Sequence, residues 1–337
     1  MTARPRTVFL GSGRFAVPIL DHLATDAGVE LVGVVTAPPR PAGRGGMVRP
    51  SPVGAWARSR WLAVQAPDRL RDEQAIAELG SLEPELLVLA DYGQIVPAEI
   101  LAMPRHGALN LHPSLLPRHR GATPIPAAIL AGDEESGVTL MRMDEGLDTG
   151  PIVAQSHQPL WGQETAPELE ERLSLAAAAL LSVTLGGWLT GKVPAVPQPV
   201  EGATLTRPLR RRDGRIDPQL DAVTLERQVR AYQPWPGSFA ETPEGRLVVW
   251  RAAPLALGPP TDGVNDLLTG PPGAGAGEAD LTGTLLPDGD GLALAVADGA
   301  LRLLEVQLAG GRRMSSADLR RGHPGLVGSR VGSAALG

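Results

Sequence analysis

The sequence predicts an α/β domain built on a mostly parallel sheet, followed by a small antiparallel β-barrel. Three observations support this fold class. In the first half of the 337-residue chain, short apolar runs alternate with segments of helical spacing. One run, Leu86–Ala90, is continuously apolar, as expected for a strand buried on both faces. In the second half, short strand-like runs are separated by frequent turns, which is typical of a small barrel.

The first elements follow in chain order. Thr7–Leu10 is a short apolar run that predicts a strand, and residues 15–26 have helical spacing. Leu31–Thr36 is apolar and β-branched, which predicts a second strand. Ser51 and Pro52 suit the N-cap and the first position of the next helix. These elements predict the start of a Rossmann-like sheet with right-handed crossovers.

The same alternation continues beyond Leu86–Ala90. Ala108–His112 and Val138–Met143 are predicted to be further strands. Thr165 and Glu168 fit a capping box that opens a long helix ending near Gly191. The apolar part of this helix, residues 173–189, is shorter than the about 20 strongly apolar residues of a membrane span, so we predict a buried helix. The N-terminus has no signal-peptide core, and we expect a cytoplasmic protein.

The pattern changes after the long helix. Residues 192–206 are rich in proline and predict a linker between a catalytic domain, residues 1–191, and a C-terminal domain, residues 207–330. Short strands are then predicted at Leu247–Trp250, Leu292–Val296 and Leu301–Val306, in an OB-like barrel. Residues 258–277 are rich in Gly and Pro and predict a surface loop.

Composition excludes several classes of protein. The chain has no cysteine, so it contains neither a disulfide framework nor a thiolate metal site nor a cysteine nucleophile. Its net charge is −6, yet the basic residues are clustered. Residues 38–67 hold five arginines and no acid, and residues 204–230 hold seven arginines against four acids. Because phosphate binding depends on local basic patches, a nucleic-acid partner remains compatible with the acidic average.

A glycine motif follows the first strand. Gly11, Gly13 and Ala16 match the G-x-G-x-x-G/A pattern of dinucleotide-binding turns. That pattern also requires an acid at the end of the second strand to bind the ribose, and the segment ending at Pro38 has none. A tight turn without a nicotinamide cofactor is therefore favoured, and an oxidoreductase is the alternative.

Three polar residues form the stronger candidate site. Asn110 and His112 lie two apart on a predicted strand, so their side chains project from the same face. Asp148 follows in a glycine-flanked turn that could bring its carboxylate to the histidine. An amide beside an imidazole can stabilise an oxyanion without a metal. A capped histidine and an ordinary turn aspartate explain the spacing equally well.

Sequence motifs favour a catalytic site over an ordinary capped histidine and turn aspartate. The pattern Asn110-x-His112 is followed by the SLLPxxRG motif of residues 114–121 and by the GLDTG motif of residues 146–150. The segment Ala90–Pro97 is similar to a further motif, A-Y-G-x-I-L-P. Together these motifs resemble the folate-dependent formyltransferase family. The resemblance extends past the predicted linker and covers nearly the whole chain.

The resemblance implies a reaction and its residues. Asn110, His112 and Asp148 would be catalytic, the donor would be 10-formyltetrahydrofolate, and no metal would be needed. The basic loop after the second strand is similar to that of family members acting on methionyl initiator tRNA, which would be the acceptor. A nucleotide sugar or glycinamide ribonucleotide is the alternative acceptor, and a non-catalytic RNA-binding protein is a further alternative. We expect neither a membrane nor an obligate protein partner.

Further residues are assigned to binding on the same grounds. The folate would contact two segments, comprising Tyr92, Gly93, Gln94, Ser114, Leu115, Leu116 and Pro117. The tRNA phosphates would contact arginines in the two basic clusters, namely Arg40, Arg44, Arg207, Arg210 and Arg211.

Overall fold

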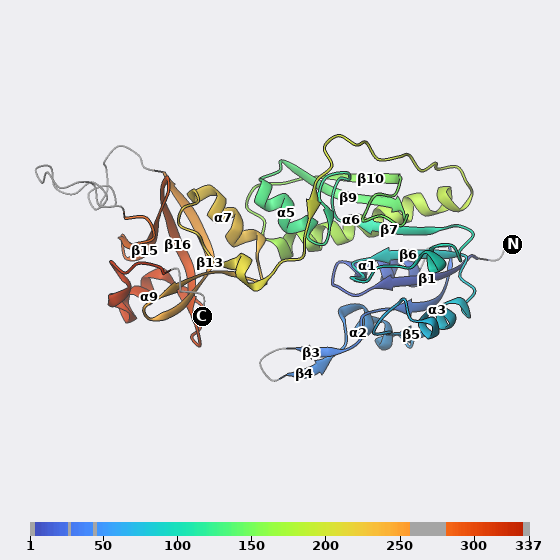
Figure 1. The fold of residues 1–337 in the computed structure, drawn as a ribbon, viewed down its shortest axis with the longest axis horizontal. Helices are drawn as coiled ribbons and strands as arrows, with labels where there is room; N and C mark the ends of the chain where they lie inside the picture. The colour runs from blue at the N-terminus through green and yellow to red at the C-terminus, as the bar shows by residue number, and fades with distance from the viewer. Residues whose placement is uncertain (1–3, 26–27, 43–45, 257–280, 333–337) are drawn as a thin grey trace, which may run out of the picture. The chain divides into compact units, whose positions relative to one another are not determined.

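The computed structural model describes residues 4–25, 28–42, 46–256 and 281–332. The chain divides into two compact units (Figure 1). The first contains most residues up to Pro208, and the second contains most residues from Leu209 onward, together with the short segments 129–132 and 162–167.

The first unit is built on a seven-stranded sheet with strand order β10-β9-β7-β6-β1-β2-β5 (Figure 1). The strands are β1 (Arg6–Gly11), β2 (Glu30–Val35), β5 (Val64–Gln65), β6 (Leu86–Ala90), β7 (Ala108–His112), β9 (Glu135–Arg142) and β10 (Ile152–Pro159). Neighbours from β5 to β7 run parallel, and β9 is antiparallel to both β7 and β10. The predicted mostly parallel sheet is confirmed. The strand order reverses between β1 and β6, where open α/β sheets form a binding crevice.

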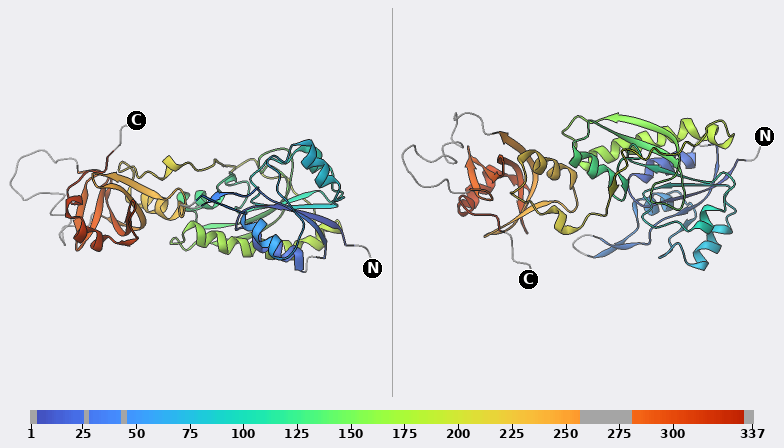
Figure 2. Two further views of the ribbon diagram at one scale, coloured as in Figure 1. Left: turned by 90° about the horizontal axis from the view of Figure 1, so that it is seen from below. Right: turned by 45° about the horizontal axis from the view of Figure 1, so that its top comes forward.

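Helices cover both faces of this sheet. They are α1 (Ala16–Thr25), α2 (Pro52–Ser59), α3 (Glu73–Gly80), α4 (Ala98–Leu101), α5 (Pro124–Ala131) and α6 (Ala166–Leu189). Val8 and Leu10 of β1 pack with residues of α3 and α4. Phe9 points to the opposite face, beside the start of α1. In the left view of Figure 2, α3 lies on one side of the sheet, and α1 and α6 lie on the other.

Local sequence explains the helix starts. Ser51 caps α2 by accepting a hydrogen bond from the Gly54 N–H at 2.9 Å, and Pro52 occupies the first helical turn. The first helix, predicted over residues 15–26, begins at Ala16 and ends at Thr25. The predicted strands Leu86–Ala90 and Ala108–His112 have the predicted bounds.

The long helix α6 buries one stripe of side chains. Leu169, Leu173, Ala177, Leu181 and Leu185 recur at every fourth residue and are almost fully buried. Leu175 and Val183, on the other side, are exposed. Among the described residues, α6 is the one helix long and apolar enough to cross a membrane by length and composition. Its single buried stripe is typical of a helix packed on a sheet, so the predicted burial applies to one face only.

The second unit contains an antiparallel sheet of order β12-β13-β16-β15-β14, with β17 paired to β16. These strands are β12 (Ser238–Thr242), β13 (Gly245–Ala256), β14 (Leu285–Asp288), β15 (Gly291–Val296), β16 (Gly299–Leu308) and β17 (Met314–Ser315). Helices α7 (Ala222–Ala231) and α9 (Ser316–Gly322) accompany them, with 3-10 turns η1 (Arg211–Gly214) and η2 (Pro324–Leu326). Leu225 and Val229 of α7 pack on Leu292, Leu301 and Val306. The predicted antiparallel domain is confirmed, and the loop predicted at residues 258–277 lies outside the described residues.

Two short strand pairs lie outside the two main sheets. Strands β3 (Arg40–Ala42) and β4 (Met47–Arg49) form an antiparallel pair after β2. Strand β8 (Arg120–Gly121) runs parallel to β11 (Leu205–Thr206), so residues far apart in sequence lie side by side.

Candidate active site

Asn110 and His112 lie at the carboxyl end of β7. Asn110 is opposite Leu89 of β6 and Met141 of β9, which places it in the middle of three adjacent strands. Leu111, between the two polar residues, is buried on the other face of the sheet. Within the part of the chain that the structure describes, the Asn110 amide makes no side-chain hydrogen bond. Its two N–H donors are therefore available to a ligand.

The tertiary structure brings Asp148 to His112. The Asp148 Oδ2 lies 3.6 Å from the His112 Nδ1, and the two side chains are 14% and 6% exposed. The His112 Nε2 lies 2.9 Å from the His119 carbonyl oxygen. The two ring nitrogens of His112 therefore face two acceptor groups, the His119 carbonyl oxygen and the Asp148 carboxylate. This arrangement orients the imidazole ring on the same face of β7 as the Asn110 amide.

The Asp148 carboxylate is held by its own loop and by a neighbouring motif. Asp148 has φ +52°, a left-handed conformation that aspartate tolerates better than most residues. Its Oδ2 accepts a hydrogen bond from the Gly121 N–H at 2.8 Å. Asp144 closes the preceding turn by accepting from the Gly146 N–H at 3.0 Å and from the Thr149 hydroxyl at 2.8 Å. The loop therefore presents one carboxylate in a defined position.

Residues 114–117 form a loop that is held by hydrogen bonds to other residues of the protein. Ser114 is buried, and its hydroxyl donates to the Arg118 carbonyl at 2.6 Å. Thr139 of β9 donates to the Ser114 carbonyl and accepts from the Leu116 N–H. Leu115 and Pro117 are half-buried. Of the predicted folate residues in this loop, Ser114 and Leu116 have scaffolding contacts, and Leu115 and Pro117 keep part of their surface open.

In the other predicted folate-binding segment, residues 92–94, two side chains contact the rest of the protein. The Tyr92 ring packs in the core between β1, β6 and α4, and burial raises its pKa to about 12. The Gln94 side chain accepts from the Leu70 N–H at 2.8 Å and donates to the Pro67 carbonyl at 3.2 Å. Gly93, between them, is exposed with φ +79°. This segment thus presents mainly backbone to solvent at Gly93.

The glycine motif after β1 contacts carboxylates. A Cβ at Gly13 would lie 1.5 Å from the Asp91 Oδ2, so glycine permits this close approach. Glu170 of α6 accepts a hydrogen bond from the Phe15 N–H at 3.1 Å, at the start of α1. Although the Asp91 residue as a whole is exposed, burial of its carboxyl group and, to a smaller extent, the charge of Glu170 raise its pKa to about 6. Carboxylates occupy the positions where a dinucleotide would place its pyrophosphate, which disfavours nicotinamide binding at this turn.

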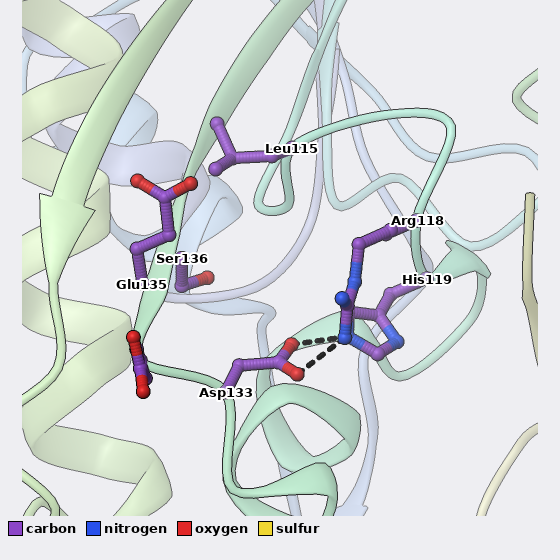
Figure 3. A pocket seen from close by; sticks show the side chains of 7 residues that line it. Leu115, Arg118, His119, Asp133, Glu135 and Ser136 are labelled. Carbon is purple, nitrogen blue, oxygen red and sulfur yellow. Dashed lines mark hydrogen bonds and ion pairs between the residues drawn. The ribbon is translucent and has the colours of Figure 1, made fainter. Parts of the chain in front are cut away.

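A cavity of about 310 Å³ lies beside His119, in the loop between β7 and β8, and is lined mainly by polar residues. Asp133 contacts both His119 and Arg118, with 2.7 Å between the Asp133 Oδ2 and the His119 Nε2 (Figure 3). The remaining lining residues are Leu115, Glu134, Glu135 and Ser136. His119 has φ +56°, and its carbonyl oxygen is the one that faces His112. Asp133 therefore holds His119 in place. The His119 carbonyl oxygen is the group that faces the ring of His112.

The predicted tRNA-binding arginines occupy several surfaces. Arg40 of β3 is exposed and directly opposite Arg49 of β4. Like charges facing each other across two strands lower stability, which favours an anionic partner for this hairpin. Arg207, Arg210 and Arg211 are exposed. Arg44 lies outside the described residues.

Sequence reasoning missed two residues that contact the site. Gln198 and Thr204 belong to the proline-rich connector, where no motif distinguished them. Gln198 donates to the Asp148 carbonyl at 2.8 Å, and the Thr204 hydroxyl accepts from the His119 N–H at 2.7 Å. Among the described residues, no group of three or more potential metal-ligating side chains is present.

Comparison with known proteins identifies relatives along nearly the whole chain. Residues 5–185 match the family described as formyl transferase, and residues 208–324 match its C-terminal domain. The chain is 40% identical to the methionyl-tRNA formyltransferase of Aromatoleum aromaticum, covering 99% of this chain and 100% of the relative. It is 44% identical to the enzyme of the same name from Gluconacetobacter diazotrophicus, covering 97% and 100%.

The following solved structure is among those that share the fold at low identity. It is HypX from Aquifex aeolicus in complex with tetrahydrofolic acid, with a TM-score of 0.57 and 18% identity. The match covers 94% of this chain and 47% of that chain.

Proposed function

The chain belongs to the formyl transferase family, and from this we propose that it transfers the formyl group of 10-formyltetrahydrofolate to the amino group of methionyl initiator tRNA. The observation that carries the proposal is the match of 40–44% identity over nearly the full length of enzymes named for this reaction. The placement of Asn110, His112 and Asp148 at one edge of the sheet gives it a chemical basis. Such an acceptor is found in the cytoplasm, where we place the protein.

The proposed reaction is an acyl transfer between two nitrogens. The unprotonated α-amine of the methionyl ester attacks the formyl carbon, and a C–N bond forms. The carbonyl electron pair moves to the oxygen, which gives a tetrahedral oxyanion. When this intermediate collapses, the bond to N10 of the folate breaks. N10 takes up one proton, and the former amine loses one. The overall reaction therefore needs no metal or redox partner.

Asn110 and His112 would stabilise the oxyanion. The Asn110 amide supplies N–H donors that no other described side chain uses. A protonated His112 supplies positive charge on the same face of β7. Donors that are already oriented require little reorganisation when the charge develops, which is why such groups contribute strongly to catalysis.

Asp148 would support His112 and would accept or relay the proton of the amine. Its carboxylate faces the Nδ1 of His112 at 3.6 Å and is held by the Gly121 N–H. The carboxylate therefore lies where it can orient the ring. A water molecule in contact with Asp148 could carry the proton from the attacking amine to N10.

The folate would bind in the crevice where the strand order reverses. Ser12 follows β1, and its hydroxyl donates to the Tyr92 carbonyl at 3.2 Å, so the two strand ends are joined there. Gly93, next in the chain, is exposed. We propose that the pterin contacts the backbone of residues 92–94 and the open surfaces of Leu115 and Pro117. The buried Ser114 and Leu116 and the half-buried Gln94 would maintain the shape of the pocket.

Arginines of the two basic clusters would bind the phosphates of the tRNA. Arg40 and Arg44 belong to a segment with no acidic residue, and Arg207, Arg210 and Arg211 belong to the second basic cluster. A guanidinium suits this task because it donates two parallel hydrogen bonds to a phosphate.

Formyl transfer to two acceptors tests the proposed function. The purified chain would be incubated with 10-formyltetrahydrofolate and either methionyl initiator tRNA or a nucleotide amino sugar. We expect N-formylmethionyl-tRNA as the product and no turnover of the sugar. Formylation of the sugar, with none of the tRNA, would contradict the proposal and establish the small-acceptor alternative.

Substitution of the basic segment separates tRNA binding from chemistry. Arg40→Ala and Arg44→Ala should each lower kcat/KM for charged tRNA by about tenfold, because a charge-assisted hydrogen bond contributes about 1.5–3 kcal/mol. Each should also reduce the slope of log affinity against log salt by about one unit per lost phosphate contact. The KM for the folate should stay the same.

Arg105→Ala is the matched control for these variants. Arg105 pairs with Glu85, which directly precedes β6. This pair therefore lies at the amino ends of the strands, whereas the candidate catalytic residues lie at the carboxyl ends. Its loss should leave the salt slope unchanged. If Arg40→Ala and Arg44→Ala behave like Arg105→Ala, this segment is not a phosphate contact.

A further inference from the structure

We propose that Gln198, on the connector between the two units, is a positioning residue that holds Asp148 against His112. The proposal rests on the proposed function, because it assigns Gln198 a role through the Asp148–His112 pair. It also changes the role of the connector: residues 196–206 form part of the active-site scaffold and do more than join two domains.

Gln198 bridges the two loops that carry the catalytic motifs. Its Nε2 donates to the carbonyl oxygens of Asp148 and Gly150, at 2.8 Å and 2.7 Å. Its Oε1 accepts two hydrogen bonds from the Arg120 guanidinium, at 3.1 Å from Nε and 2.7 Å from Nη2. The half-buried side chain thus uses both of its donors and its acceptor on two segments more than 25 residues apart in sequence.

The connector is anchored on both sides of Gln198. Val196 exchanges two backbone hydrogen bonds with Ile152, at 2.7 Å and 2.8 Å, at the start of β10. Thr204 accepts from the His119 N–H through its hydroxyl and from the Arg120 N–H through its carbonyl. A side chain between two such anchors loses little additional conformational freedom when it binds, so its hydrogen bonds can position a loop effectively.

The second anchor requires a glycine. Gly121 has φ +101°, and a Cβ there would lie 2.3 Å from the Thr206 carbonyl oxygen. Glycine therefore allows β11 to approach β8 closely, and the same Gly121 donates its N–H to the Asp148 Oδ2. The connector consequently supports the catalytic carboxylate by two routes, through Gly121 at the side chain and through Gln198 at the backbone.

The position of the carboxylate depends on this backbone support. Asp148 adopts a left-handed conformation, which costs conformational energy for a residue with a Cβ and is maintained only by its surroundings. Removal of the Gln198 donors would leave the Asp148 and Gly150 carbonyls without these bonds and would let the loop relax. A displacement of roughly 1 Å at a reacting group can cost about 10²-fold in rate.

The test uses the full chain and two substitutions. Gln198→Met keeps the length of the side chain and removes all four hydrogen bonds. Gln198→Glu keeps the acceptor for Arg120 and removes the two donors. We expect both to lower kcat for tRNA formylation by about 10²-fold, with the KM for the folate within about threefold of wild type. Recovery of wild-type kcat by Gln198→Glu would show that the contact with Arg120 suffices, and it would overturn the proposal.

Gln233→Met is the matched control. Gln233, in the second unit, also donates to two carbonyl oxygens, those of Val229 at 3.1 Å and Trp250 at 2.8 Å. We expect it to lower the midpoint of thermal unfolding about as much as Gln198→Met and to leave kcat unchanged. If the two variants lose kcat equally, the loss in Gln198→Met reflects general destabilisation and the proposal is wrong.

A double-mutant cycle distinguishes this proposal from the proposed function. If Gln198 acts through Asp148, then adding Gln198→Met to Asp148→Asn should lower kcat by less than about threefold further. Additive losses would overturn the role of Gln198 and leave that of Asp148 intact. Near-normal activity of Asp148→Asn alone would overturn the assigned role of Asp148 and, with it, this proposal. A wild-type chain that fails to formylate charged tRNA would contradict the proposed function itself.

Discussion

Asn110→Ala is expected to lower the rate of formyl transfer by about 10²–10³-fold, the typical loss for one oxyanion donor. The alanine retains the strand position between Leu89 and Met141 and removes the amide that would donate to the developing charge. Because this interaction strengthens mainly in the transition state, the affinity for the folate should change little.

Single-turnover rates with saturated enzyme measure this loss directly. The control is the folate dissociation constant of the same variant, which should stay within a factor of about three of wild type. A rate within that same factor would remove Asn110 from the proposed mechanism. A loss confined to folate affinity would instead assign the amide to ground-state binding.

Asp148→Asn is expected to lower turnover by roughly 10³–10⁴-fold, as seen when a carboxylate that orients a catalytic histidine is replaced by an amide. The asparagine can still accept from the Gly121 N–H through its remaining oxygen. Its NH2 group then faces the His112 Nδ1 in place of a carboxylate oxygen. The ring would lose the neighbouring negative charge and would meet a donor instead of an acceptor.

The pH dependence of kcat tests this assignment. In the variant, the limb of the profile that reports the Asp148–His112 pair should disappear. Asp21→Asn is a suitable control, because Asp21 lies on α1 and its carboxylate forms an exposed ion pair with Arg60. An unchanged profile with near-normal turnover would reduce Asp148 to an ordinary turn residue.

Much of the fold was predictable because its signals are local. The continuous apolar run Leu86–Ala90 matches β6 residue for residue, since a central strand of a parallel sheet is buried on both faces. Ser51 and Pro52 begin α2 as predicted, because capping depends on neighbouring residues alone. For α6, the sequence predicted a buried helix without indicating which face is buried. The structure shows that the helix buries the face that contains Leu169 and Leu185, while Leu175 and Val183 are exposed.

The candidate site was predictable only in part. The shared face of Asn110 and His112 follows from the two-residue period of a strand. The contact between His112 and Asp148 depends on a loop 36 residues away, which spacing alone left open. Gln94, assigned to the folate by its motif, has its side chain bonded to residues 67 and 70 in the structure. Whether it also contacts a ligand remains a prediction of the motif.

The sequence by itself determined the strand and helix types, the face shared by Asn110 and His112, and the family, because these depend on local periodicity and contiguous motifs. Only the tertiary structure decided which distant groups support them. Three contacts join segments that are separate in the sequence. They are the Asp91 carboxylate beside Gly13, the His119 carbonyl oxygen at the His112 Nε2, and the Gln198 amide at the Asp148 carbonyl. A hydrogen bond between such segments depends on how the sheet and connector pack in space, and no local sequence pattern encodes that distance.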